Sequence, residues 1–118
     1  MNFKFFSLSE FDCPSLPDSG INMDSQFLAK LEQARELAGI PFKITSGYRA
    51  KEHNAEVGGV PNSSHLVGVA ADIAVSGGAD RYIILNALIK AGFKRIGIAK
   101  TFIHCDTDET KSNSVWTY

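Results

Sequence analysis

Two histidines and one aspartate stand in or beside short apolar runs of this chain, where a polar side chain needs a partner. His65 precedes residues 69–75, a run whose single charge is Asp72, and His104 lies in a second run that ends at Asp106. Burying an unpaired carboxylate or an unsatisfied imidazole is costly. Two imidazoles and one carboxylate suit zinc, with a fourth position open for water. The pattern predicts a zinc site at His65, Asp72 and His104; the alternative is a turn-capping histidine and an aspartate bonded to backbone.

The composition is that of one globular domain. The 118 residues are 44% hydrophobic and 21% charged, with a formal net charge of −1. A chain of this size can bury an ordinary core. It has no basic or acidic run, so neither nucleic acid nor a membrane surface is expected as a partner. We expect a monomer.

The beginning of the chain does not read as a secretion signal. The apolar residues of segment 1–8 are soon followed by Glu10 and Asp12, and no apolar stretch approaches the length of a membrane span. We therefore expect synthesis in the cytoplasm, with separate delivery to any target outside. The two cysteines, Cys13 and Cys105, form no C-x-x-C pattern, so a thiolate zinc cluster is not indicated. They are either two buried thiols or a disulfide.

Apolar periodicity predicts helices at residues 23–38 and 80–91, the first with Asp24 as N-cap and Gly39 at its end. Alternating or short apolar runs predict strands, and one further segment could form a short helix. The strands are expected at residues 3–6, 42–46, 69–75, 95–99 and 102–106, and the short helix at 50–57. Residues 1–118 are thus predicted to form one α+β domain with helices on a mainly antiparallel sheet.

Strand alternation assigns the polar candidates to faces. Asp72 shares a face with two alanines, which leave room for another group near its carboxylate. His104 and Asp106 share a face of their strand, and Cys105 points to the other. In the polar segment 107–118, Trp116 and the terminal tyrosine either line a cleft or close the core.

A longer motif surrounds these residues. Its order is Ser63-x-His65-x-x-Gly68-x-Ala70-x-Asp72, with Ser46-Gly47-Tyr48-Arg49 before it and Ile103-His104-x-Asp106 after it. This arrangement, over roughly residues 7–107, resembles the zinc D-Ala-D-Ala carboxypeptidase family. That family shares its fold with the hedgehog signalling domain and with many phage endolysins, so the resemblance implies a hedgehog/DD-peptidase fold.

The resemblance also implies roles for individual residues. His65, Asp72 and His104 match the family's ligands of Zn²⁺. Arg49 matches the arginine that holds the carboxylate end of the substrate, for which a guanidinium is suited because it donates two parallel hydrogen bonds. Ser63 matches a serine that contacts the substrate.

The general base is where the chain departs from the family pattern. Many members place an acidic residue three positions before the last histidine ligand, and here that position is Thr101. Other members read His-x-Asp instead, which points to Asp106 as the base. A side chain two positions from His104 on a strand could equally serve only to orient that histidine.

The expected function is a zinc metallopeptidase that hydrolyses D-amino-acid-containing bonds in peptidoglycan stem peptides. It would act as a D,D-carboxypeptidase or as an endopeptidase of the endolysin kind, on the cell wall, encoded by a phage or stored inside the cell. The substrate class comes from the resemblance alone. The rival interpretation is a catalytically inactive, hedgehog-like binding module that contains zinc.

Overall fold

A five-stranded sheet forms the centre of the structure, a computed structural model that describes residues 3–118. Its strands lie in the order β1-β2-β4-β3-β5, and every neighbouring pair is antiparallel except β3 and β5. The strands are β1 (Ile44–Ser46), β2 (Ala70–Ala74), β3 (Arg95–Ile98), β4 (Phe102–Asp106) and β5 (Ser114–Thr117). The α+β class with a mainly antiparallel sheet is confirmed.

Three α-helices accompany the sheet: α1 (Ser25–Ala38), α2 (Lys51–Glu56) and α3 (Gly78–Lys90). The Asp24 side chain accepts a hydrogen bond from the backbone N–H of Phe27 (2.8 Å), as an N-cap does. Gly39 ends α1 in the left-handed region at φ 69°, which glycine adopts without strain. Both signals for this helix were correct. The described residues also form three 3₁₀ turns: η1 (Leu8–Phe11), η2 (Ser19–Asn22) and η3 (Ser64–Val67).

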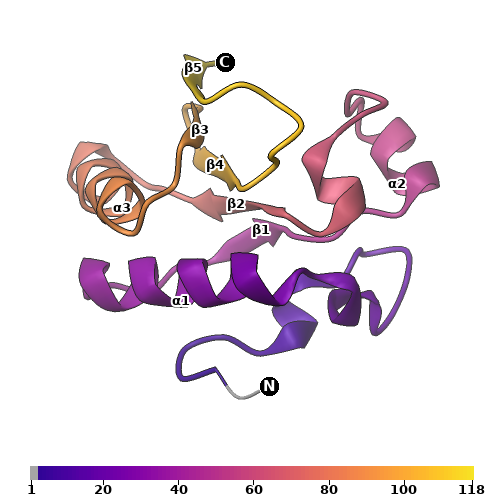
Figure 1. The fold of residues 1–118 in the computed structure, drawn as a ribbon, viewed down its shortest axis with the longest axis horizontal. Helices are drawn as coiled ribbons and strands as arrows, with labels where there is room; N and C mark the ends of the chain where they lie inside the picture. The colour runs from indigo at the N-terminus through magenta and orange to yellow at the C-terminus, as the bar shows by residue number, and fades with distance from the viewer. Residues whose placement is uncertain (1–2) are drawn as a thin grey trace.

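The two faces of the sheet differ in the side chains that they carry. Ala71, Ile73 and Cys105 are fully buried in the core, together with apolar side chains of α1 and α3. The residues between them, Asp72 and His104, project from the opposite face. Figure 1 shows α1 running along the sheet, with α3 and α2 at opposite ends of the molecule. One face of the sheet therefore stabilises the fold, and the other is left to carry polar side chains.

Residues 3–6 do not form the predicted strand. Phe6 is buried against Phe11 and Phe42, with ring centroids 5.5 and 6.4 Å away, so the apolar side chains do enter the core. The backbone of the segment, however, follows the helix rather than the sheet: the N–H of Phe5 donates to the side chain of Glu32 on α1 (2.6 Å). An apolar run predicts burial but not which partner its backbone finds.

Strand β5 was not predicted, because residues 114–117 lie in a segment that reads as polar. It pairs in parallel with β3, a strand far from it along the chain, with Gly97 opposite Trp116. Cys13 and Cys105 are both buried and free, which settles the open choice against a disulfide. Among the described residues, no helix has the length and the apolar character needed to cross a membrane.

Candidate metal centre

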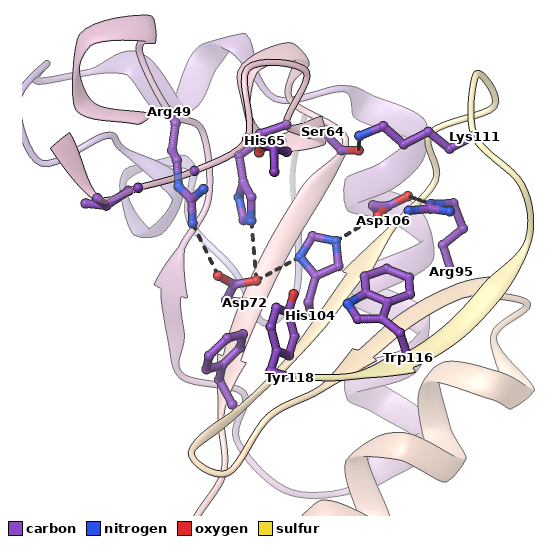
Figure 2. Close-up of a pocket in the computed structure, with 16 residues that line it drawn as sticks. Arg49, Ser64, His65, Asp72, Arg95, His104, Asp106, Lys111, Trp116 and Tyr118 are labelled. Atoms are coloured by element: carbon purple, nitrogen blue, oxygen red, sulfur yellow. Dashed lines mark hydrogen bonds and ion pairs between the residues drawn. The ribbon is translucent and has the colours of Figure 1, made fainter. Parts of the chain in front are cut away.

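Two polar residues of the site, Asp72 and His104, lie in one row across the sheet with Gly97 and Trp116. Asp72 on β2 is opposite His104 on β4, His104 is opposite Gly97 on β3, and Gly97 is opposite Trp116 on β5. Residues in such register have Cβ atoms about 5 Å apart on a shared face. The third predicted metal ligand, His65, lies on η3, and its side chain points toward Asp72 (Figure 2).

Asp72 is the centre of the group. Its Oδ1 lies 3.3 Å from His65 Nε2 and 2.9 Å from His104 Nδ1, and all three side chains are buried. One ligand atom from each of these residues falls within 4.8 Å of the others. Tetrahedral ligands about 2.0–2.1 Å from a zinc ion are roughly 3.3 Å apart. The donor atoms are therefore spaced as the ligands of one metal ion would be.

His65 is held so that one nitrogen faces the site. Its turn begins at Ser63, whose hydroxyl accepts the His65 backbone N–H (3.3 Å), and ends at Gly68 with φ 74°. A Cβ at Gly68 would come within 2.3 Å of the Asn22 carbonyl oxygen, so this turn requires glycine. The ring Nδ1 lies 2.7 Å from the Gly47 carbonyl oxygen, which can only accept. Nδ1 therefore carries a proton, and Nε2 is the nitrogen that faces Asp72.

His104 is oriented in the same way but with the opposite nitrogen. Its Nε2 donates to Asp106 Oδ2 (2.7 Å), and its Nδ1 is the nitrogen that faces Asp72 Oδ1 (2.9 Å). The other oxygen of Asp106 accepts from Arg95 Nε (2.8 Å) and from the Asp108 backbone N–H (3.1 Å). Asp106 is 1% exposed. With both oxygens occupied, its contacts match the orienting role better than that of a base.

His104 and the two carboxylates beside it shift one another's pKa values toward the charged forms. Burial alone would raise the pKa of Asp72, but hydrogen bonds and charge from His104 and His65 hold it well below its usual range. For Asp106, burial is likewise outweighed by the bonds from His104 and the nearby cation Arg95, and its pKa is lowered. Burial lowers the pKa of His104 less than the bonds to the two carboxylates raise it. Both carboxylates are therefore ionised at neutral pH.

The chemistry of the donor set fits a divalent metal. With a metal ion bound, each imidazole would offer one lone pair beside the Asp72 carboxylate oxygen, and the second nitrogen of each ring is already hydrogen-bonded. A divalent cation bound there would replace the protons that otherwise join these nitrogens to the Asp72 oxygen. Cys105 adds no ligand, since it points into the core, where burial raises the pKa of its thiol well above the ordinary value.

Arg49 lies at the edge of this group, as its position after β1 predicts. Its Nη2 is 3.6 Å from Asp72 Oδ2, its Nε donates to Ser46 Oγ (3.2 Å), and its Nη1 donates to Asn54 Oδ1 (3.2 Å). The Arg49 side chain is held in place and lines the same pocket as Ser63. The structure thus brings together all six residues proposed from the sequence: Arg49, Ser63, His65, Asp72, His104 and Asp106. Their roles toward a substrate stay predictions.

The pocket over this group has a volume of about 380 Å³. Trp116 and Tyr118 line it, which decides between the two positions left open for them. Their rings lie close to other aromatic rings: Trp116 is 5.5 Å from His104, and Tyr118 is 5.2 Å from Phe102.

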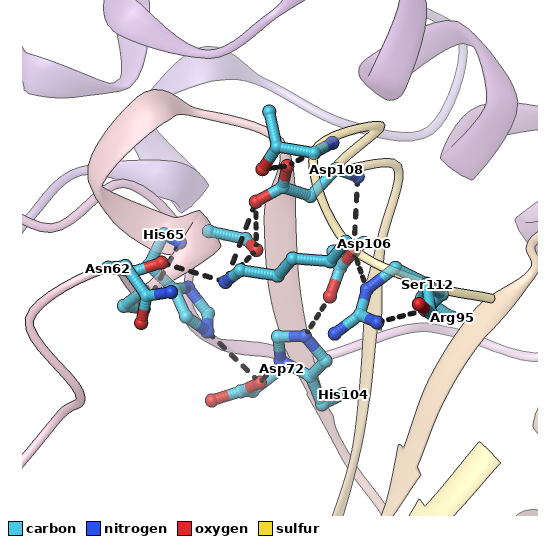
Figure 3. Close-up of polar contacts among 12 residues, drawn as sticks. Asn62, His65, Asp72, Arg95, His104, Asp106, Asp108 and Ser112 are labelled. Atoms are coloured by element: carbon cyan, nitrogen blue, oxygen red, sulfur yellow. Dashed lines mark hydrogen bonds and ion pairs between the residues drawn. The ribbon is translucent and has the colours of Figure 1, made fainter. Parts of the chain in front are cut away.

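The loop between β4 and β5 is fastened to the turn that carries His65 (Figure 3). Ser64 Oγ donates to Asp108 Oδ2 (2.7 Å), and Lys111 Nζ donates to the Asn62 carbonyl (2.7 Å) and to Ser64 Oγ (3.0 Å). The bond from Thr110, with the other contacts, outweighs burial and lowers the pKa of Asp108 to about 2. Ser64 and Lys111 of this set also line the pocket.

Arg95 contacts several residues of the site, although its position in the sequence did not single it out. It pairs with Asp106, donates to the Ser112 carbonyl and lies over the Trp116 ring at 4.9 Å. A signal was present: in a hairpin formed by residues 95–98 and 102–106, Arg95 falls opposite Asp106, and opposite charges are favoured at such positions.

Comparison with known proteins gives one result at the family level. The family model described as Peptidase M15 matches residues 4–106, which include every residue proposed for the site. No curated protein matches the chain.

Proposed function

Because the chain belongs to the peptidase M15 family, whose members depend on a metal, we propose that it is a zinc peptidase acting on peptidoglycan stem peptides. The family match confirms the resemblance to the zinc D-Ala-D-Ala carboxypeptidases. The proposed bond is one next to a D-amino acid, cleaved by D,D-carboxypeptidase or endopeptidase action. Delivery to a cell wall and a phage origin stay predictions.

One observation supports the metal-dependent chemistry most directly. His65 Nε2 and His104 Nδ1 lie 3.3 and 2.9 Å from the same oxygen of Asp72, while the opposite nitrogen of each ring is hydrogen-bonded elsewhere. These three residues would hold the zinc ion. When bound, the ion would supply water activated near neutral pH and polarisation of the scissile carbonyl.

The chain's own residues would bind and align the substrate. Arg49 would grip a carboxylate of the peptide, and Ser63 would contact its backbone. Asp106 would keep His104 in the tautomer that leaves Nδ1 free, with Arg95 holding Asp106 in turn. Lys111, from the loop of residues 107–113, would line the pocket beside the bound peptide.

Digestion of purified peptidoglycan and of a synthetic stem peptide ending in D-Ala-D-Ala tests the proposal. Protein loaded with one zinc per chain should cleave a D-amino-acid bond, a chelator should abolish cleavage, and added zinc should restore it. Mass spectrometry would identify the action, because a carboxypeptidase releases free D-alanine whereas an endopeptidase creates a new amine inside a cross-link. Absence of both products with zinc-loaded protein would refute the enzyme.

Thr101 favours a second candidate, the hedgehog-like binding module, because the usual acidic residue is missing there. The module would bind zinc and peptide without releasing any product. The same digestion, combined with calorimetric measurement of peptide binding, separates the two functions.

Arg49→Lys should selectively weaken the binding of substrates that have a free terminal carboxylate. Lysine keeps the charge but lacks the planar pair of donors, so KM should rise roughly ten- to a hundredfold. For the same peptide with an amidated C-terminus, the rise in KM should be much smaller. Arg81→Lys is the control, since its guanidinium bonds the Lys100 carbonyl away from the pocket. Equal losses for both peptides would contradict the carboxylate role.

A further inference from the structure

Part of the pocket comes from outside the region that the family model matches. That region ends at residue 106, yet Lys111, Trp116 and Tyr118 line the pocket together with the metal-site residues. The segment is firmly attached: β5 pairs with β3, and the Tyr118 N–H donates to the Ile98 carbonyl (3.2 Å). Residues 107–118 therefore add a wall to the site that the family motif does not describe.

Gly97 makes room for this wall. A Cβ at this position would lie 2.6 Å from Trp116 Nε1, and 2.7 and 2.9 Å from two further atoms of the indole. The indole thus lies across β3 at the one place in the row that has no side chain. In this arrangement the ring centroids of Trp116 and His104 are 5.5 Å apart.

The Trp116 indole packs against two other side chains. The Arg95 guanidinium covers the Trp116 ring at 4.9 Å, and the Tyr118 ring lies 6.5 Å from it. Tyr118 nevertheless remains 69% exposed, so its ring is available for contact. Aromatic surfaces held in place in this way bind apolar groups with little loss of conformational freedom.

The polarity of the pocket sets the direction of a bound peptide. Arg49 lies on one side of Asp72, and Trp116 and Tyr118 lie on the other (Figure 2). A peptide whose terminal carboxylate meets Arg49 must cross the metal ligands toward the aromatic rings. The residue that contributes the scissile carbonyl then lies beside them. We propose that Trp116 and Tyr118 bind the aliphatic side chain of that residue, and that Gly97 keeps their surface in place; this rests on the proposed function.

Kinetics on two matched stem peptides test whether Trp116 and Tyr118 bind this side chain. One peptide has alanine before the scissile bond, and the other has glycine there. Trp116→Ala should raise KM for the alanine peptide about tenfold, with little change in kcat or zinc affinity. The glycine peptide, which lacks the contacting methyl, should change much less. Val115→Ala is the control on the same strand, because Val115 is 62% exposed and outside the pocket. Equal KM changes for both peptides would overturn the proposal.

Gly97→Ala gives an independent test, because it leaves every ring in the sequence but displaces the indole. It should raise KM for the alanine peptide as much as Trp116→Ala does. In the Trp116→Ala background the same change should add little, since the clash is gone. Additive effects of the two substitutions would overturn the role of Gly97.

Fluorescence distinguishes an error in the proposed binding role of Trp116 and Tyr118 from an error in the proposed peptidase function. Trp116 is the only tryptophan of the chain, so its emission reports on the wall itself. Titration with the alanine peptide should change this emission saturably in zinc-loaded protein, even if no bond is cleaved. Saturable binding by calorimetry with no change in emission would overturn the wall. Absence of cleavage, with the emission change present, would refute only the peptidase.

Discussion

The Asp72→Asn protein is expected to lose more than about a hundredfold in zinc affinity and with it all peptidase activity. Asparagine has nearly the same shape but removes the charge of the oxygen that both histidines face, at 3.3 and 2.9 Å. Loss of a residue that merely orients a ligand already costs about 10- to 100-fold in metal affinity, so loss of a ligand should cost more. Competition with a chromophoric chelator measures the affinity directly.

Thermal unfolding provides a second readout for the same substitution. Zinc that binds only the folded chain should raise the wild-type melting temperature in proportion to the logarithm of its concentration, and should leave Asp72→Asn unchanged. Asp18→Asn is the matched control, since Asp18 is exposed and has a left-handed backbone conformation that asparagine tolerates. Wild-type zinc affinity in Asp72→Asn would contradict the metal centre.

Much of the site was predictable because its residues violate the pattern around them. Asp72 is the single charge of an apolar strand, and His104 stands between residues that belong in the core. Strand alternation then assigned each of them to a face of its own strand, and the pairing of β2 with β4 places Asp72 opposite His104. The helix of residues 25–38 was predictable for a related reason, because its cap and its stop are local signals.

The features that were missed depend on contacts between distant parts of the chain. Strand β5 forms by pairing with the edge of β3, and no pattern within residues 114–117 predicts that pairing. The importance of Gly97 follows from the same pairing, since it reflects the position of the Trp116 indole and not any backbone requirement of its own. Conversely, residues 3–6 had a strand-like composition but found their hydrogen-bond partner on α1.

Asp106→Asn is expected to lower zinc affinity about 10- to 100-fold while leaving substantial turnover at saturating zinc. The reason is that His104 Nε2 donates to Asp106 and so depends on it for its orientation. A general base would give the opposite result: unchanged zinc affinity and a fall in kcat of roughly 10²- to 10⁴-fold. Measuring kcat across a zinc titration distinguishes the two, and a loss of kcat that zinc cannot restore would establish the base.

The Asp106→Ala substitution should also destabilise the fold, by about 3 kcal/mol, because it leaves the Arg95 guanidinium without its carboxylate. The side chain of Arg95 is only 15% exposed, so water cannot fully replace the lost partner. Removing both charges, as in Arg95→Leu with Asp106→Leu, should cost less than Asp106→Ala alone if the unpaired cation is the cause. Urea unfolding of the zinc-free proteins measures these differences without interference from the metal. A double variant that is less stable than Asp106→Ala would instead locate the cost in the lost hydrogen bonds to His104 and Asp108.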